Sequence, residues 1–323
     1  MIRPGSLTRL ADGVRIGTVT LNAAIDKRYV VETLRPGHVM RVSDCVYSAG
    51  GKGLNVARVA RVAGAQVLAT GFLGGHAGEF IADQLANDSI AHDFVRVAGE
   101  SRSCVNIYDQ TTGETSELLE PGIEVQGDDL ALLSETYRSV LDQVDVVVIS
   151  GSAPRGCPLD VYVPLINAAR HAGKRLILDT SGTLLAQAVT EGPSLIKPNL
   201  DEARGLLGPS GDGDPVRLGR ALVSQGVEHV VLSRGAQGAY LITADVVLEA
   251  VAPRIDAVNT VGCGDAMVAA LAIGLAAGVD PADLLTLAVG VGTAAAMTPG
   301  TGSFRPTDLD DLLARGIAVR EIT

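Results

Sequence analysis

Short apolar segments alternate with longer helical patterns along the second half of the chain. Residues 146–149, 176–178 and 230–232 are wholly apolar, and each run is followed by polar or glycine-rich residues and then by a helix-like stretch. Strands that read as continuous apolar runs are buried on both faces, as in a parallel sheet covered by helices. The pattern predicts a three-layer α/β/α fold with a mostly parallel sheet, and ligands in such folds bind beyond the strand ends.

Two segments depart from this rhythm. Residues 26–48 and 100–120 alternate polar and apolar side chains, the second around a turn at Gln110-Thr-Thr-Gly113. This alternation is typical of strands with one exposed face. We expect the two segments to form a small antiparallel β-sheet that acts as a lid. Residues 1–14 read as a polar tail, which leaves residues 15–323 as one domain.

Composition and charge exclude several classes of protein. The chain of 323 residues carries a net charge of −11, which argues against a nucleic-acid or acidic-membrane partner. Its start has no signal-peptide pattern, and its uncharged runs fall short of a membrane span. The four cysteines are far apart, so a disulfide framework or a zinc site is not expected. We expect a cytoplasmic protein.

The segment Asn259-Thr-Val-Gly-Cys-Gly-Asp265 carries the most specific chemistry. It precedes an apolar, helix-like run over residues 266–279. A helix N-terminus has unpaired N–H groups and partial positive charge, so it attracts an anion. An anion site beside a carboxylate base suits phosphoryl transfer to a hydroxyl. The alternative is that Asp265 is only a favourable charge at a helix start and the glycines form a tight turn.

Five motifs in a fixed order support the chemical interpretation. They are Asn22-Ala-Ala-Ile-Asp26, Gly50-Gly-Lys-Gly-Leu-Asn55, Lys197-Pro-Asn-Leu-Asp-Glu202, Ser233-x-Gly-x-x-Gly238 and Thr260-Val-Gly-Cys-Gly-Asp265. No P-loop and no dinucleotide-binding fingerprint is present. With these motifs the chain resembles the ribokinase-like (PfkB) carbohydrate kinases over nearly all of residues 15–320.

The resemblance implies a role for each motif. Asp265 would take the proton from the acceptor hydroxyl, and the N–H groups of Gly262, Cys263 and Gly264 would hold the charge that develops on the transferred phosphoryl group. The implied substrate-binding residues are Asp26, Gly51, Lys52, Asn55, Arg102 and Ser152. The implied nucleotide-binding residues are Lys197, Asn199, Ser233, Gly235, Gly238, Thr260 and Thr293. The cofactors would be ATP and Mg²⁺, with Asn199 and Glu202 holding the metal through water. These two residues could instead simply cap a helix.

The substrate rests on fewer residues. Lys52 and Arg102 look like the phosphate-binding pair of members that act on sugar phosphates, which favours fructose 1-phosphate or tagatose 6-phosphate. Departures such as Ala23 in Asn22-Ala-Ala, Cys263 for the usual Ala and Asn259 leave the sugar open. The alternatives are a 6-phosphofructokinase, a kinase of an unphosphorylated sugar or nucleoside, and a non-catalytic sensor. A homodimer through the lid is a further expectation.

Cys263 allows two interpretations. Its position at a helix N-terminus would stabilise a thiolate, lower its pKa and make the site sensitive to alkylation. Alternatively, it is a small buried thiol that fills the place of an alanine.

Overall fold

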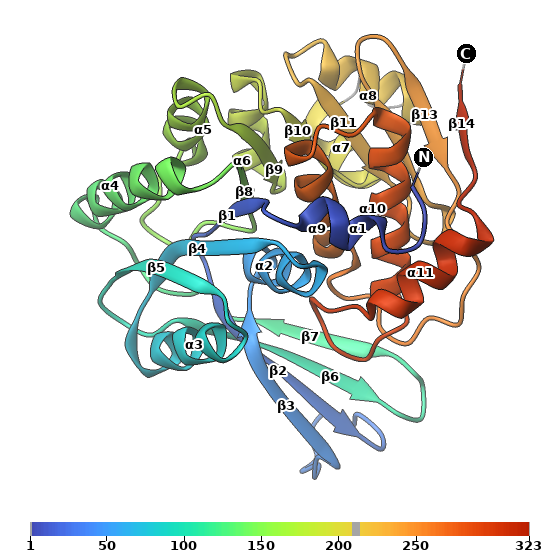
Figure 1. Ribbon diagram of the computed structural model, residues 1–323. Helices are drawn as coiled ribbons and strands as arrows, with labels where there is room; N and C mark the ends of the chain where they lie inside the picture. The colour runs from blue at the N-terminus through green and yellow to red at the C-terminus, as the bar shows by residue number, and fades with distance from the viewer. Residues whose placement is uncertain (1, 209–213, 323) are drawn as a thin grey trace.

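In the computed structural model, which describes residues 2–208 and 214–322, a ten-stranded sheet lies between two layers of helices (Figure 1). The strand order is β14-β13-β12-β11-β10-β9-β8-β1-β4-β5. Neighbours from β11 to β5 are parallel, and the three pairings from β11 to β14 are antiparallel. The predicted α/β/α class is confirmed. The strands are β1 (Arg15–Thr20), β4 (Gln66–Leu73), β5 (Ala91–Arg96), β8 (Val146–Ser150), β9 (Arg175–Asp179), β10 (Leu195–Ile196), β11 (His229–Ser233), β12 (Ala239–Ile242), β13 (Val247–Ala250) and β14 (Val319–Glu321).

Strand β8 shows why the apolar runs form the centre of the sheet. Val146 and Val148 belong to one buried cluster, whereas Val147 and Ile149 belong to the other. Successive side chains of a strand point to opposite faces, so a wholly apolar strand needs a helical layer on each side. One face is covered by α2 (Lys52–Ala63), α9 (Cys263–Ala276), α10 (Pro281–Ala296) and α11 (Pro306–Arg315), and the other by α4 (Gly127–Gln143), α5 (Tyr162–His171), α6 (Gly182–Ala188), α7 (Leu200–Leu207) and α8 (Pro215–Val223).

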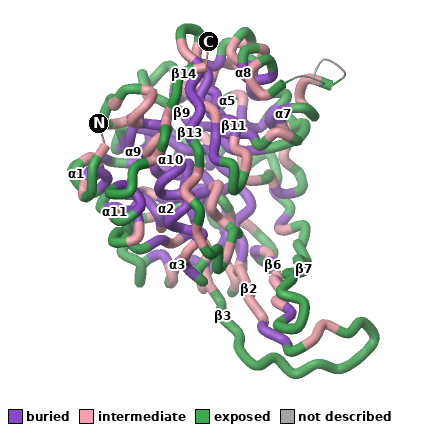
Figure 2. Tube along the Cα trace, turned by 90° about the vertical axis from the view of Figure 1, so that its right-hand side faces the viewer, coloured by how far each residue is buried: buried purple, intermediate pink, exposed green. Residues whose placement is uncertain are grey.

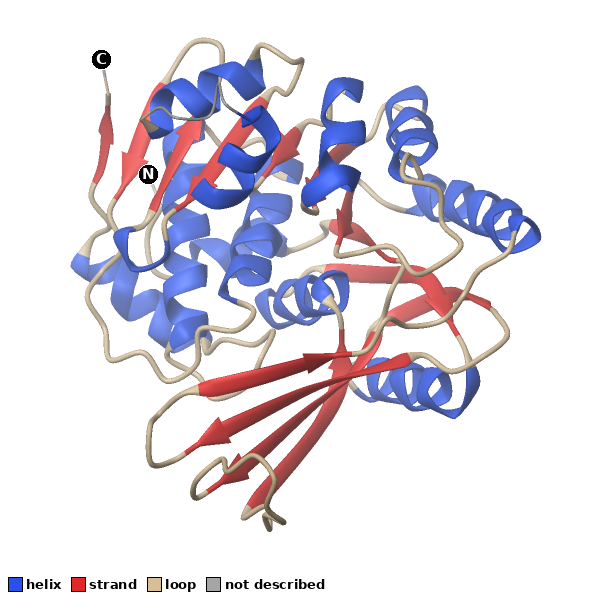
Figure 3. Ribbon diagram, turned by 180° about the vertical axis from the view of Figure 1, so that it is seen from behind, coloured by secondary structure: helices blue, strands red, loops and turns tan. Residues whose placement is uncertain are grey.

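A separate four-stranded sheet projects from the core (Figures 2 and 3). Its order is β3-β2-β6-β7, from β3 (Asp44–Gly50), β2 (Ala24–Val31), β6 (Arg102–Asp109) and β7 (Thr115–Leu119). The strands lie in or beside the two alternating segments. The sheet is not purely antiparallel, because β2 and β6 pair in parallel. Both strands follow strands of the large sheet and lead away from it, and therefore run in the same direction. Helix α3 (Gly75–Asn87) packs against β2, β3 and β5.

The first fourteen residues differ from the expected polar tail. They include helix α1 (Ser6–Ala11), whose Leu7 and Ala11 are buried in the main core. Six residues with three apolar positions give too short a pattern to predict a helix. Two 3₁₀ turns, η1 (Val189–Glu191) and η3 (Gly235–Gln237), complete the described elements. Within residues 2–208 and 214–322, none of the helices combines the length and apolar character needed to cross a bilayer.

Candidate active site

Two cavities meet at the N-terminus of α9. The larger has a volume of about 810 Å³ and the smaller of about 420 Å³, and Gly264 lines both. The larger cavity is lined by the predicted nucleotide residues Asn199, Ser233, Gly235, Gly238, Thr260 and Thr293, together with Cys263. The smaller is lined by the predicted substrate residues Asp26, Gly51, Lys52, Asn55, Arg102 and Ser152, together with Lys197, Gly262 and Asp265. The structure therefore sorts the sequence-predicted residues into two adjoining groups, from which only Glu202 is absent.

Helix α9 can begin where it does because residue 262 is glycine. Gly262 has a left-handed backbone with φ of 82°, and a Cβ there would lie 3.0 Å from both Gly302 N and Thr301 Cγ2. The N–H groups of Gly264 and Asp265 lie in the first turn, where the helix offers no carbonyl partner. The Cys263 N–H reaches only Thr260 O, at 3.4 Å. This helix end is a suitable anion site at the junction of the cavities.

Asp265 is buried, and among the described residues its side chain has one hydrogen-bond partner. Only 6% of the residue is exposed, and its Oδ2 accepts a hydrogen bond from Asn55 Nδ2 at 2.7 Å. Burial, and then the charge of Asp179, raise the pKa of Asp265 to about 7, against the opposing effects of Asn55, Lys52 and Lys197. A carboxylate with a pKa near neutrality is a more effective general base than an ordinary one.

Asp179, at the end of β9, is a central residue that the sequence analysis did not include in the site. It is 2% exposed, and its two oxygens lie 3.3 Å from Lys197 Nζ and 3.7 Å from Lys52 Nζ. It also accepts a hydrogen bond from Ser150 Oγ at 3.0 Å. Burial alone would raise the pKa of Asp179, but the two lysines bring it below its ordinary value. Its position directly after a buried strand was the available signal.

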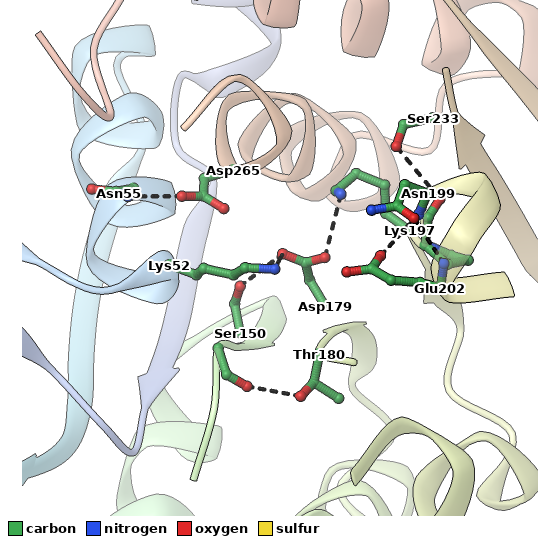
Figure 4. Close-up of polar contacts among 12 residues, drawn as sticks. Lys52, Asn55, Ser150, Asp179, Thr180, Lys197, Asn199, Glu202, Ser233 and Asp265 are labelled. Atoms are coloured by element: carbon green, nitrogen blue, oxygen red, sulfur yellow. Dashed lines mark hydrogen bonds and ion pairs between the residues drawn. The ribbon is translucent and has the colours of Figure 1, made fainter. Parts of the chain in front are cut away.

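The two lysines lie close to the helix end. In Figure 4 the Lys52 and Lys197 ammonium groups converge on Asp179 from opposite sides, near Asp265. A Cβ on Gly264 would lie 3.2 Å from Lys197 Nζ, so this ammonium stands directly over the anion site. Asp179 is the first cause that raises the pKa of Lys52. Positive charge is thus held at the place where the two cavities meet.

Asp26 faces the smaller cavity from the projecting sheet. Burial raises its pKa to about 6, although Arg58 and Arg102 oppose the rise. Its carboxylate occupies the space beside Gly50, where a Cβ would lie 2.1 Å from Asp26 Cγ. The glycine cluster therefore makes room for Asp26 as well as for the start of α2. Arg102 donates to Asn22 O at 3.1 Å and Glu120 O at 3.3 Å, which fixes its guanidinium at the cavity wall.

Several polar atoms of the smaller cavity's lining residues have no protein partner. Within the described part of the chain, Thr20 Oγ1, Asn22 Oδ1 and Asn106 Oδ1 are buried without a hydrogen bond. Asn22 also donates to Ser152 Oγ at 3.2 Å. Buried polar atoms normally have partners, but Thr20 Oγ1 lies against Gly53 and Asn22 Oδ1 against Gly122, and none of the three atoms is exposed to the cavity. The groups available to a ligand are therefore the other polar side chains of the lining, among them Asp26, Lys52 and Asn55.

Asn199 and Glu202 form the cap of α7. Asn199 Oδ1 accepts from Glu202 N at 2.8 Å, and Glu202 Oε2 accepts from Asn199 N at 2.9 Å. This is the capping arrangement left open by the sequence. Glu202 also helps to raise the pKa of Lys52, so its negative charge acts on the junction. Its second oxygen fits contact with a hydrated Mg²⁺, but the residues described contain no cluster of three His, Cys, Asp or Glu side chains that could bind a metal directly.

The remaining predicted residues have more ordinary surroundings. Thr293 donates its hydroxyl to Val289 O at 2.7 Å, within α10, and contributes its buried surface to the larger cavity. The hypothesis of a reactive thiolate at Cys263 is wrong. Burial, and then the charge of Asp265, raise the pKa of that thiol to about 11, because both disfavour the thiolate.

The chain was compared with known proteins. Residues 16–308 match the pfkB family carbohydrate kinases. Phosphofructokinase-2 from Escherichia coli in complex with potassium is 29% identical, with a TM-score of 0.86 over 94% of this chain and 99% of that one. The same enzyme with fructose-6-phosphate gives 27% identity and a TM-score of 0.83 over 94% and 99%. A possible 1-phosphofructokinase from Thermotoga maritima is 26% identical, with a TM-score of 0.85 over 96% of this chain and 100% of that one. The chain belongs to the pfkB family of carbohydrate kinases, which transfer a phosphoryl group to a hydroxyl acceptor.

Proposed function

We propose that this chain is an ATP- and Mg²⁺-dependent kinase of a phosphorylated ketohexose, with fructose 1-phosphate or tagatose 6-phosphate as acceptor. One observation carries the proposal. The N-terminus of α9 is shared by a larger and a smaller cavity, and the smaller contains the carboxylate of Asp265. ATP in the larger cavity would present its γ-phosphoryl group to an acceptor in the smaller one.

The residues at the junction supply the proton transfer and the charge stabilisation. Asp265 takes the proton of the acceptor hydroxyl as that oxygen forms its bond to the γ-phosphorus. The bond from the γ-phosphorus to the bridging oxygen breaks, and ADP leaves. The N–H groups of Gly264 and Asp265, with Lys197 above them, stabilise the transferred group. Mg²⁺, held through water by Glu202 and Asn199, would neutralise phosphate charge.

The charge of the smaller cavity supports a phosphorylated acceptor. Its lining contains three acidic residues, Asp26, Glu117 and Asp265, and three basic ones, Lys52, Arg102 and Lys197. Asp179 and Arg58, which lie behind this lining, add one charge of each sign, so the local balance is neutral in a chain with a net charge of −11. The Lys52 side chain is 44% exposed, so its ammonium can bind an incoming phosphate as well as Asp179. Lys52 and Arg102 are the proposed phosphate-binding residues.

Fructose 6-phosphate is a second candidate acceptor. It is favoured by the similarity to phosphofructokinase-2, which has been solved with that sugar phosphate. Lys52 instead favours fructose 1-phosphate or tagatose 6-phosphate, because of the resemblance of its glycine-rich motif. The substrate panel below separates them.

The projecting sheet suggests a homodimer. Tyr47 of β3 and Leu118 of β7 stand in the same row across the sheet, on the face away from the smaller cavity, and are 48% and 61% exposed. Exposed apolar surface of this kind marks association sites. We propose that two copies pair through this sheet in the cytoplasm, where the free thiols would stay reduced. Light scattering of Leu118→Asp against the wild type tests the dimer, and an unchanged mass would contradict it.

The assay for the function is ADP release with ATP, Mg²⁺ and a panel of acceptors. Fructose 1-phosphate, tagatose 6-phosphate, fructose 6-phosphate, fructose and ribose form the panel. Lys52→Ala and Arg102→Ala should each raise the KM for the sugar phosphate about tenfold or more, because a charged hydrogen bond is worth about 1.5–3 kcal/mol. Arg217→Ala, an exposed change on α8, is the control. A preference for fructose or ribose over every sugar phosphate would contradict the proposal.

A further inference from the structure

Arg58 joins three parts of the site, although none of the motifs assigns it a role there. It lies on α2, one turn after Asn55. Its guanidinium donates to Ala49 O, at the end of β3, to Asn55 Oδ1 at 2.6 Å and to Thr301 O at 3.4 Å. Burial lowers its pKa, and Asp26, Asp88 and Asp265 oppose that effect. The guanidinium therefore stays cationic at neutral pH.

The contact with Asn55 determines which end of that amide faces Asp265. A guanidinium only donates hydrogen bonds, so Arg58 can bond to Oδ1 of the amide, which accepts, and not to Nδ2, which donates. With Oδ1 directed to Arg58, Nδ2 donates to Asp265 Oδ2 at 2.7 Å. Asp265 Oδ1 has no hydrogen bond to any residue that the structure describes, and it is left for the acceptor proton.

The Asn55 side chain is also confined by its surroundings. A Cβ on Gly302, whose φ is 63°, would lie 2.8 Å from Asn55 Oδ1 and 2.9 Å from its Cβ. The loop that contains Gly302 also touches Gly262 at the start of α9, and Arg58 holds this loop through Thr301 O. Arg58 thus fixes both the amide and the loop packed against it.

We propose that Arg58 is a positioning residue for the base. It holds Asn55 Oδ1 so that Nδ2 stays on Asp265 Oδ2 and the other carboxylate oxygen faces the acceptor. The inference rests on the proposed function, in which Asp265 takes the proton. As that proton arrives, the carboxylate loses its charge and attracts the Asn55 N–H less strongly. Arg58 then keeps the amide from turning its oxygen toward the base, so the site returns to its starting geometry.

Surrounding charges do not replace this contact. Asp179, Lys52 and Lys197 act on Asp265 from the strand ends and the start of α2, whereas Asn55 is the side chain that hydrogen-bonds to it. If the role of Arg58 were purely structural, its replacement should lower kcat by the same factor with or without Asn55. This difference can be measured.

The test is a double-mutant cycle on kcat with Arg58→Met and Asn55→Ala. Methionine keeps the length of the side chain without its donors. Arg58→Met should lower kcat about 10- to 100-fold, as expected for loss of a charged hydrogen bond, with the KM for ATP changed less than about twofold. In the Asn55→Ala background the same change should cost less than about twofold. Arg61→Met is the control, because Arg61 lies on the same helix and its side chain, within the described residues, is hydrogen-bonded to Ser89 O alone, at 3.2 Å.

Two results would overturn the inference. One is an equal loss of kcat from Arg58→Met in both backgrounds, and the other is a loss that appears as a higher KM for ATP. The cycle uses whichever acceptor the wild type phosphorylates best. A wild type without kinase activity would therefore refute the proposed function and not the positioning role of Arg58. If Arg58→Met does not fold, Arg58→Lys replaces it. Lysine keeps the positive charge but lacks the planar guanidinium and its several N–H donors, so kcat should still fall. Full activity of Arg58→Lys would refute the positioning role of Arg58.

Discussion

Asp179→Asn should shift the pH dependence of turnover to lower pH. The pKa of Asp265 rises from an ordinary 3.8 to about 7, first through burial and second through the charge of Asp179. At about 1.4 kcal/mol per pH unit, the whole rise corresponds to roughly 4 kcal/mol between the protonated and ionised forms. Asparagine removes the like charge and leaves the lysines unopposed, and both changes favour ionised Asp265.

The measurement is kcat/KM between pH 5 and 9, whose acid limb reports the pKa values of the free enzyme. In the wild type that limb should fall near pH 7, with a second contribution from Asp26, whose pKa is about 6. In Asp179→Asn the contribution of Asp265 to the acid limb should move to lower pH by about one unit or more. Overall activity should also fall, because Lys52 and Lys197 lose their shared anchor.

Asp145→Asn is the matched control for this change. Asp145 also pairs with a basic side chain, that of Arg15. However, it precedes the first residue of β8, whereas Ser150 and the site lie at the other end of that strand. Its removal should leave the profile unaltered. An acid limb that stays in place, or moves to higher pH, in Asp179→Asn would refute the electrostatic account of the base.

Two further predictions follow from the packing of the site. Gly50→Ala places a methyl group 2.1–2.4 Å from the Asp26 carboxyl atoms and should raise the KM for the acceptor about tenfold without changing the KM for ATP. Gly127→Ala is the control, because Gly127 has open space around it and the variant should behave as wild type. An unaltered KM for the acceptor in Gly50→Ala would contradict the assignment of Asp26. Cys263, with its pKa raised to about 11, should react with iodoacetamide at pH 7.5 more slowly than exposed Cys45, as read by peptide mass spectrometry; faster labelling of Cys263 would contradict this.

The fold could be predicted because its signals are local. The apolar runs that became β8, β9 and β11 need helices on both sides, and the glycines before Asp265 mark the start of α9. The parallel pairing of β2 with β6 could not be predicted, since it joins segments about seventy residues apart. Asp179 and Arg58 escaped for the same reason. Asp179 has one local signal, its position at the end of a buried strand, and Arg58 has none. The importance of each arises from the contacts with Lys197 or with Asn55 and Thr301 that folding creates.

Cys263 shows where a local rule fails. The helix end alone predicts a low thiol pKa, but the buried carboxylate two residues later acts in the opposite direction and adds to the effect of burial. The depth of burial follows from α9 lying at the centre of the molecule, where the described residues from Asp265 to Leu275 are all buried. The carboxylate is part of the motif, but the burial of that carboxylate and of the thiol cannot be read from it.

The most direct test of the account is single-turnover phosphoryl transfer by Asp265→Asn. Asparagine keeps the size of the side chain but cannot accept the proton, so transfer should slow by about two to four orders of magnitude while ATP binding is kept. Asp83→Asn, exposed on α3, controls for the substitution. Because the folded-state pKa of Asp265 lies above 3.8, its ionised form costs stability as the pH rises through about 7. Asp265→Asn should therefore melt at a higher temperature than the wild type at pH 8. Transfer at a near-normal rate by this stably folded variant would contradict the central claim.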